Sequence, residues 1–165
     1  RGAAEVVAVD VGYGQLHERL RADARVRSME RTNIRHVTAD AVGGPFPVVV
    51  ADLSFISLTT VAPVLAGELA APAADLVVLV KPQFEAGREI VSRGRGVVRD
   101  PAEWAAALER VASSFEAAGA AIMGGMVSPL KGADGNVEFL LHARAHTPGR
   151  ERAFDPVALA AAGVD

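Results

Sequence analysis

The 165-residue sequence contains no cysteine. It therefore forms no disulfide, and it has neither a cysteine nucleophile nor a metal site with thiolate ligands. Long apolar runs are also missing, since none approaches the roughly 20 residues of a membrane-spanning helix, and no signal-peptide pattern opens the chain. We therefore expect a cytoplasmic protein that does not contact a membrane.

An excess of charge of one sign is lacking as well. The chain has 17 Lys and Arg against 20 Asp and Glu, which gives a net charge of −3. The whole surface therefore does not attract nucleic acid, and any RNA contact must come from a local patch or from another segment. The four histidines are scattered without metal-ligand spacing, so we predict no metal site. Half of the residues are apolar, which indicates a globular chain with a sizeable core.

Short apolar runs alternate with helical segments along the chain. We predict helices at 15–22, 58–69 and 100–118, a helical turn at 33–37, and strands at 5–10, 26–29, 47–51, 76–80, 121–127 and 137–143. The connection between the last two strands is too short for a crossover helix, so these strands should be antiparallel. This order predicts an α/β fold, a doubly wound and mostly parallel sheet with one antiparallel strand near the C-terminus.

Two segments carry no regular pattern. Residues 82–99 are rich in glycine and arginine, and we predict a long surface loop there. The Ala-rich tail, 147–165, is either a short helix or loose. Arg88, Arg93, Arg95 and Arg99 lie in or at the end of the predicted loop. They form either a clamp for RNA phosphates or an ordinary solvated surface, and their excess over acidic residues favours RNA contact.

Asp10, Asp52 and Lys81 each directly follow an apolar run. Ligands of an open parallel sheet bind beyond the carboxyl ends of its strands, so these side chains should lie along one edge. Asp10 either accepts the hydroxyls of a ribose or is a solvated strand-end acid or helix cap. Lysine beside a carboxylate suits the removal of a proton from a weakly acidic hydroxyl. Asp52 and Lys81 form either such a pair or a salt bridge without a catalytic role.

Glu138 stands between apolar residues of the last predicted strand. If it faces inward it needs a partner, which Lys81 or an arginine could supply; otherwise it faces water on an edge strand. Gly12 and Gly14 follow the first strand, but His17 stands where a dinucleotide fingerprint needs its third glycine. We therefore predict a tight turn at this point rather than a dinucleotide loop.

Six stretches in one order resemble a known family. They are 9–16 (VDVGYGQL), 29–35 (MERTNIR), 52–58 (DLSFISL), 80–85 (VKPQFE), 96–101 (GVVRDP) and 135–140 (GNVEFL). Together they resemble the TlyA or haemolysin-A family of bacterial rRNA methyltransferases, which is related to the FtsJ-type ribose methyltransferases. The resemblance covers residues 4–145.

The resemblance implies a Rossmann-like methyltransferase that uses S-adenosylmethionine to methylate cytidine 2′-hydroxyls of ribosomal RNA, with ribosomal subunits as partners. By motif, Asp52, Lys81 and Glu138 match the last three members of a Lys-Asp-Lys-Glu tetrad. Lys81 would accept the 2′-hydroxyl proton, and Asp52 and Glu138 would position it. Asp10 would hold the cofactor ribose and Asn33 would lie near the adenine, with Asp52 also beside the cofactor.

The glycine-rich cofactor loop of the family, its first tetrad lysine and its RNA-binding module would all precede Arg1. We therefore expect residues 1–146 to be a partial FtsJ-like methyltransferase domain that lacks its first, central strand, and 147–165 to be a C-terminal tail. Alone, such a chain should bind the cofactor weakly or not at all, and its incomplete sheet could form a non-native oligomer.

Three other interpretations stay open at this point. A catalytically inactive RNA-binding scaffold of the same fold is disfavoured by the retained Asp52, Lys81 and Glu138. A membrane-active haemolysin is disfavoured because the sequence has no basic amphipathic helix of the interfacial kind. A nucleotide-binding oxidoreductase is disfavoured because the fingerprint glycines are not visible.

Overall fold

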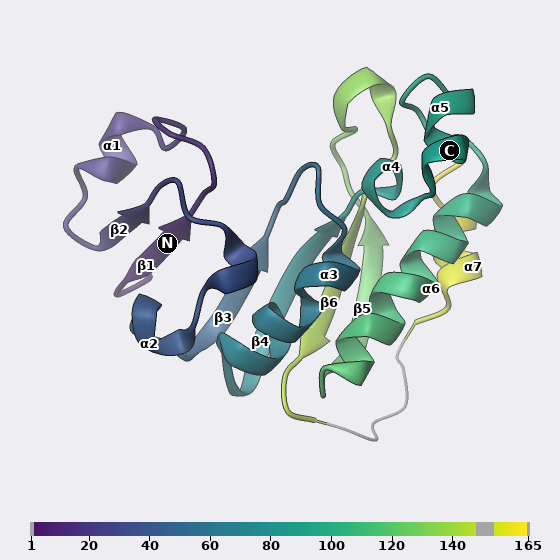
Figure 1. Ribbon diagram of the computed structural model, residues 1–165. Coiled ribbons are helices and arrows are strands. Elements are labelled where there is room, and N and C mark those ends of the chain that lie inside the picture. Colours follow the sequence, from purple (N-terminus) through teal and green to yellow (C-terminus); the bar gives the residue numbers. More distant parts are fainter. Residues whose placement is uncertain (1, 148–153, 165) are drawn as a thin grey trace.

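The computed structural model describes residues 2–147 and 154–164 (Figure 1). The strands are β1 (Val6–Val9), β2 (Val26–Met29), β3 (Phe46–Ala51), β4 (Ala70–Val80), β5 (Ala121–Val127) and β6 (Phe139–Arg144). The helices are α1 (Glu18–Arg21), α2 (Ala39–Val42), α3 (Leu58–Ala62), α4 (Pro82–Glu85), α5 (Arg88–Arg93), α6 (Pro101–Ala117) and α7 (Pro156–Ala161). A π-helical segment, Pro63–Glu68, extends α3, and short 3₁₀ turns lie at Ile34–His36 and Ala133–Gly135.

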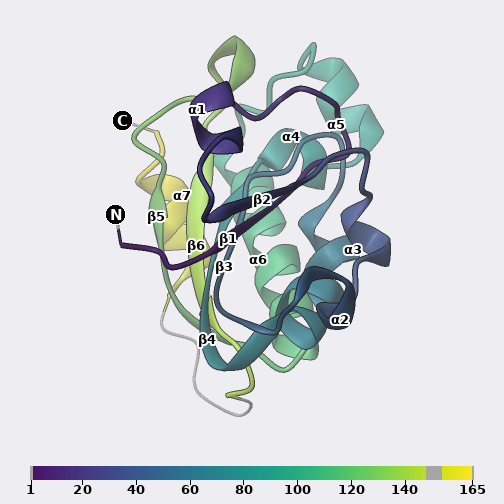
Figure 2. The same cartoon turned by 90° about the vertical axis from the view of Figure 1, so that its left-hand side faces the viewer.

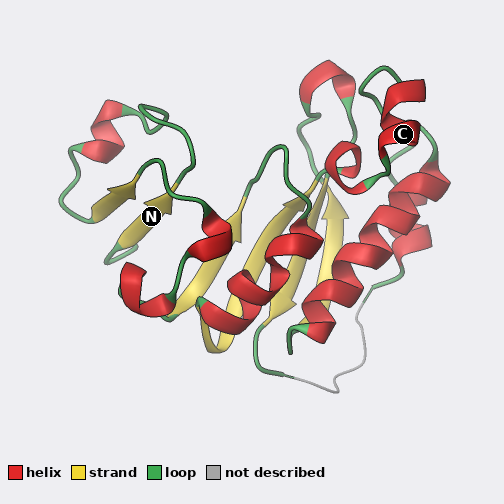
Figure 3. Cartoon of the chain, viewed as in Figure 1, coloured by secondary structure: helices red, strands yellow, loops and turns green. Residues whose placement is uncertain are grey.

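The strands form two sheets (Figure 3). The larger sheet has the order β3-β4-β6-β5, and β1 and β2 form a separate parallel pair. β3 and β4 are parallel, whereas β6 is antiparallel to both β4 and β5. The predicted α/β sheet, mostly parallel with an antiparallel strand near the C-terminus, is thereby confirmed.

The two sheets are separated between β1 and β3. In the described part of the chain β1 pairs only with β2, and β3 pairs only with β4, so each strand keeps one free edge. Residues of both strands line one cavity of about 340 Å³, among them Val7 and Val9 of β1 and Val49 of β3. Figure 1 shows the β1–β2 pair apart from β3 and β4, and in Figure 2, seen from that side, β1 and β2 lie in front of the larger sheet.

One face of the larger sheet is packed against α3, the π-helical segment and α6, and this layer holds the core. On β4, Leu76, Val78 and Val80 are fully buried. Helix α6 faces them with apolar residues at spacings of three and four, the pattern of one helical face: Trp104, Leu108, Val111 and Phe115. The helix begins after Asp100, whose side chain accepts a hydrogen bond from the Ala102 amide at 2.9 Å. It ends before Gly119, which has a φ of +87°.

The opposite face of β4 and β6 carries a small polar cluster. Asp75 Oδ1 accepts a hydrogen bond from Arg144 Nη2 at 2.8 Å and lies 2.9 Å from His142 Nε2. Hydrogen bonds from Arg144 and then His142 lower the pKa of the Asp75 carboxyl. The cluster links β4 to β6 across their antiparallel ladder, in which Asp75 pairs with Arg144.

Several local expectations need correction. Residues 82–99 are not one loop, because α4 and α5 lie within them; both helices are too short to show a helical period. Strand β4 begins six residues before its predicted start, at Ala70, and β6 begins at Phe139 rather than at Val137. Helix α2 was not predicted, although its Thr38 cap and Gly43 end are ordinary helix signals. In the tail, the helical alternative is confirmed by α7.

Helix α7 packs against α6 and reaches β5. Leu159 of α7 lies against Gly125 of β5, where an added Cβ would come within 2.7 Å of it. None of the helices within residues 2–147 and 154–164 has both the length and the apolar character that crossing a membrane requires.

The buried position of Phe115 gives a stability prediction. Phe115→Ala should lower the free energy of unfolding by about 3–5 kcal/mol, because it leaves a cavity under α6. Phe55 is 92% exposed and is the matched control, since the same substitution there removes almost no buried area. Phe55→Ala should change the unfolding free energy by less than about 0.5 kcal/mol in the same urea titration. Equal losses in both variants would contradict the described core.

Candidate active site at the carboxyl ends of β3 and β4

An ion pair joins the residues that follow β3 and β4. Lys81 Nζ lies 2.6 Å from Asp52 Oδ1, and it also donates a hydrogen bond to Ser54 Oγ at 3.3 Å. The parallel pairing of β3 with β4, in which Ala51 lies opposite Val78, brings these two strand ends to one edge of the sheet. The Lys81 side chain is only 13% exposed, whereas that of Asp52 is 70% exposed. The lysine is therefore held in place from a shielded position while its carboxylate partner faces solvent.

The segment that follows β3 and the segment that follows β4 also contact each other at further points. The rings of Phe55 and Phe84 are 5.2 Å apart between centroids. Glu85 Oε2 accepts a hydrogen bond from Ser57 Oγ at 2.5 Å, and its Oε1 accepts one from the Leu58 amide at 2.7 Å. Burial raises the pKa of the Glu85 carboxyl, an effect that the two hydrogen bonds and the charge of Arg110 oppose. Sequence reasoning singled out neither Phe55 nor Glu85.

Glu138 is buried, with 7% of its surface exposed, and directly precedes β6. Its Oε1 accepts a hydrogen bond from Gln83 Nε2 at 3.0 Å. The inward-facing alternative therefore applies, but the partner is Gln83 of α4, rather than Lys81 or an arginine. Gln83 Oε1 is itself buried and has no hydrogen-bond partner in the described part of the chain. A hydrogen bond thus links Glu138 to the segment that carries Lys81.

Asp10 and Asn33 lie at the carboxyl ends of the other pair of strands. Both are exposed: Asp10 Oδ1 accepts a hydrogen bond from the Gly12 amide at 2.7 Å, and Asn33 Oδ1 accepts one from the Arg35 amide at 3.1 Å. The Thr32 amide donates to the Asp10 carbonyl, which keeps the two loops together. Neither residue has a described contact with the Asp52–Lys81 pair. The structure thus groups the predicted residues in two places, on either side of the division between the sheets.

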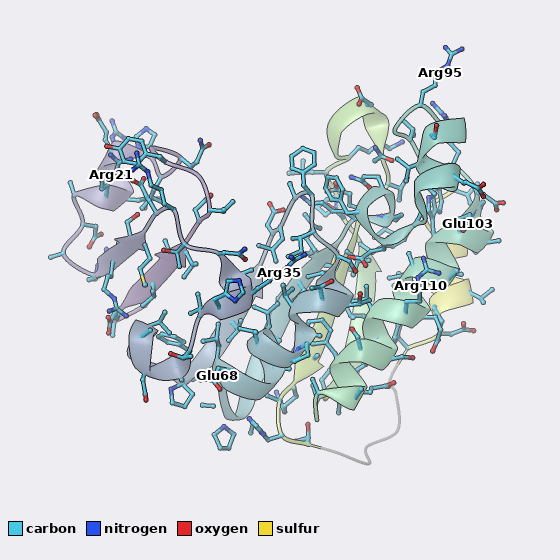
Figure 4. All side chains as sticks on the ribbon, viewed as in Figure 1. Arg21, Arg35, Glu68, Arg95, Glu103 and Arg110 are labelled. Atoms are coloured by element: carbon cyan, nitrogen blue, oxygen red, sulfur yellow. The ribbon has the colours of Figure 1, made fainter. Side chains whose placement is uncertain are left out.

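The arginine-rich segment is only partly described at the side-chain level. Arg88 and Arg93 belong to α5, and their side chains lie outside the described part. Arg95 and Arg99 are exposed, and Figure 4 shows Arg95 extending away from the ribbon.

Asn136 is a buried polar residue that sequence reasoning also missed. Its Oδ1 accepts a hydrogen bond from the Val98 amide, and its Nδ2 donates to the Gly96 carbonyl, both at 3.1 Å. Trp104 Nε1 in turn donates to the Val98 carbonyl at 2.9 Å. Asn136 therefore fixes the chain between α5 and α6 against the connection before β6.

A cavity of about 450 Å³ opens between the segments that follow β3 and β4. Its lining is mostly apolar and includes Phe55, Ile56, Phe84 and Val91, with Gln83 as a polar member. Such a lining suits a flat organic ring better than a metal ion. In residues 2–147 and 154–164 no three His, Cys, Asp or Glu side chains are grouped so that they would hold a metal ion.

The backbone at Gly132 approaches Glu138 closely. A Cβ added at Gly132 would come within 2.6 Å of Glu138 Cδ and would overlap its Oε1. Gly132→Ala should therefore displace the buried carboxylate from Gln83 and lower the free energy of unfolding by about 1–3 kcal/mol. Gly124→Ala is the control, because nothing lies within 4 Å of its added Cβ, and its stability should stay within about 0.5 kcal/mol of the parent. An unchanged free energy of unfolding in Gly132→Ala would contradict the described packing.

Comparison with known proteins identifies the family of the chain. The family profile described as FtsJ-like methyltransferase matches residues 1–145. A 16S/23S rRNA (cytidine-2′-O)-methyltransferase TlyA of Mycobacterium tuberculosis is 53% identical over 147 residues, which cover 89% of this chain and 54% of that protein. A putative rRNA methyltransferase YqxC of Bacillus subtilis is 50% identical over 149 residues, covering 90% of this chain and 52% of that protein.

Among solved structures, a putative hemolysin from Streptococcus thermophilus superposes with a TM-score of 0.89 at 39% identity, over 98% of this chain and 58% of that one. The chain spans about half the length of the curated relatives that it matches. The family profile, in contrast, extends over most of this chain. The chain belongs to the FtsJ-like methyltransferase family.

Proposed function

We propose that the protein uses S-adenosylmethionine to methylate the 2′-hydroxyl of a cytidine in ribosomal RNA, and that this chain holds the substrate side of the reaction centre. The observation that carries the proposal is the shielded Lys81 amine, held 2.6 Å from Asp52 at the carboxyl edge of a parallel sheet. The name of the Mycobacterium tuberculosis relative supports both the 2′-oxygen and the cytidine. A ribosomal substrate in turn supports a cytoplasmic location.

The reaction requires a proton to leave a ribose hydroxyl as its oxygen takes up a methyl group. A bound S-adenosylmethionine supplies that methyl group, carried on a positively charged sulfur. In this proposal Lys81 reacts as the neutral amine, having first released its own proton to solvent; its Nζ then accepts the hydroxyl proton, and Asp52 stabilises the ammonium that results. Ser54 Oγ, which accepts from Nζ at 3.3 Å, fixes the amine in a second direction.

Glu138 acts more indirectly in this proposal. Its bond to Gln83 fixes the α4 segment that follows Lys81, so the buried carboxylate positions the lysine through the chain. Glu138 is therefore a positioning residue in this proposal.

The residues at the ends of β1 and β2 suit a nucleoside. Asp10 Oδ1 accepts from the Gly12 amide, and a carboxylate has further lone pairs with which to accept the two hydroxyls of a ribose. Ile34 and Leu53 line the cavity between β1 and β3 and offer apolar surface to a flat base. Asp10 and Asn33 would hold the adenosine part of S-adenosylmethionine, with Asp52, which lines the same cavity, beside it.

The RNA side of the site is apolar and basic. The Phe55 ring is 92% exposed three residues after Asp52, and it lines the 450 Å³ cavity. An exposed ring beside the reacting group is suited to stacking on an unpaired base. Arg95 and Arg99 would contact phosphates near the same site, and Arg88 and Arg93 would add to this charge on the basis of the sequence.

Removal of Lys81 should abolish methyl transfer. In the full-length gene product, Lys81→Ala should reduce transfer from radiolabelled S-adenosylmethionine to ribosomal RNA by about 10²–10⁴-fold, because the proton acceptor is lost. The affinity for S-adenosylmethionine, measured by titration calorimetry, should be unchanged. Lys131→Ala, at an exposed lysine of the β5–β6 connection, is the control and should keep the parental rate. A wild-type protein that binds ribosomal RNA tightly but transfers no methyl group would instead support the inactive scaffold.

Phe55 gives a separate test of the RNA side. Phe55→Ala should weaken productive RNA binding, raising KM for RNA or lowering kcat/KM by about 5- to 100-fold, which corresponds to one lost base–aromatic stack. Phe55→Tyr retains an aromatic face and should keep most of the activity. Stability should not change in either variant, because the ring is exposed. An alanine variant as active as the tyrosine variant would exclude a stacking role.

A further inference from the structure

Between β3 and α3 the chain runs through residues 52–57 with little packing of its own. Asp52, Ser54 and Phe55 are exposed, while Leu53 and Ile56 are only half-buried. Phe55 has a φ of +62°, a conformation that side chains with a Cβ rarely adopt. A segment with so few buried contacts needs other interactions to keep one conformation.

Those interactions come from residues 81–85. Lys81 holds the start of the segment through Asp52 and Ser54. Glu85 holds its end, since its two carboxylate oxygens accept hydrogen bonds from Ser57 Oγ and from the Leu58 amide. The Phe55–Phe84 contact lies between these two attachments. The segment that carries Asp52 and Phe55 is therefore attached at both ends to the segment that carries Lys81.

Glu85 is in turn attached to α6. Arg110 of α6 donates a hydrogen bond from Nη2 to the Glu85 carbonyl at 3.1 Å. Figure 4 shows Arg110 on α6, the long helix that covers the sheet. Leu58, whose amide Glu85 binds, is buried at the start of α3. A chain of direct contacts thus runs from α6 through Glu85 to the first turn of α3.

We propose that Glu85 is the positioning residue that fixes residues 52–57 over Lys81, so that Asp52 and Phe55 keep the places that methyl transfer requires. The proposal rests on the function proposed above. Without the Glu85 carboxylate, the segment stays attached at its start through Lys81 and at the Phe55–Phe84 ring contact, but its end before α3 is released. Misplacement of a reacting group by about 1 Å can cost on the order of 100-fold in rate.

Glu85→Gln and Glu85→Ala separate this role from simple packing. The glutamine variant keeps an oxygen for the Leu58 amide and an amide group that can meet Ser57 Oγ, whereas the alanine variant removes both contacts. Glu68→Ala is the matched control. Glu68 Oε1 accepts a hydrogen bond from the Ala39 amide at 2.8 Å, so a carboxylate again binds the first turn of a helix. Figure 4 places Glu68 at the end of the molecule opposite to α4 and α5.

The test combines hydrogen exchange with methyl transfer in the full-length gene product. Glu85→Ala should speed amide exchange at residues 53–59 and lower kcat for ribosomal RNA by about 10- to 100-fold. Glu85→Gln should restore slow exchange and most of kcat. Glu68→Ala should speed exchange around α2 but leave kcat at the parental value.

Each contrary result has a distinct meaning. Unchanged exchange at residues 53–59 in Glu85→Ala would overturn the positioning role, as would faster exchange with a parental kcat. An equal loss of kcat in Glu68→Ala would assign the effect to general destabilisation and would also overturn it. An inactive wild-type protein with intact RNA and cofactor would overturn the proposed function itself, and the positioning role for that reaction with it.

Discussion

The pairing of β4 on both of its edges is the constraint on which the rest of this structure depends. β4 is parallel to β3 on one side and antiparallel to β6 on the other. Its inward-facing residues Leu76, Val78 and Val80 are fully buried against the helical layer. Because β4 is fixed on both edges and on one face, its end has little freedom. Lys81 stands at that end, so the sheet itself sets the position of the amine.

Much of this arrangement is predictable from the sequence because buried parallel strands are short apolar runs that end in polar residues. The ends of β3 and β4 are evident in this way, and so is the proximity of Asp52 and Lys81, which follows from parallel pairing. The capped start of α6 and its glycine end are equally local signals. Each of these features depends on neighbouring residues in the chain or on one general rule of sheet geometry.

The features that escape sequence reasoning depend on contacts between distant segments. The bond of Glu138 to Gln83 exists only because a four-residue helix turns Gln83 toward β6, and so short a helix has no period to detect. Asn136 binds a segment about 40 residues away along the chain. Phe55 contradicts the usual expectation that a large apolar side chain is buried. Its backbone has a positive φ, which a phenylalanine in the sequence does not predict.

Three carboxylates near the ends of β3 and β4 have three different environments. Asp52 is exposed and paired with an amine, Glu138 is buried and bound to an amide, and Glu85 is largely enclosed and binds the start of a helix. Similar side chains thus acquire separate roles through their surroundings, as is usual where a protein assembles reactive groups. The short segment after β4 takes part in all three environments, because it supplies Lys81 to Asp52, Gln83 to Glu138, and Glu85 itself.

The free edges of β1 and β3 have a consequence for how this chain behaves at high concentration. Such edges carry backbone amide and carbonyl groups that have no strand partner within the described residues, both strands line a cavity with mostly apolar walls, and Val48 and Val50 of β3 are 59% and 74% exposed. Water satisfies such groups less completely than another extended backbone does, and unpaired parallel edges are templates for strand addition. Colloidal stability of the 165-residue chain should therefore be limited by these edges rather than by its net charge, and light scattering should rise with concentration before the core itself unfolds.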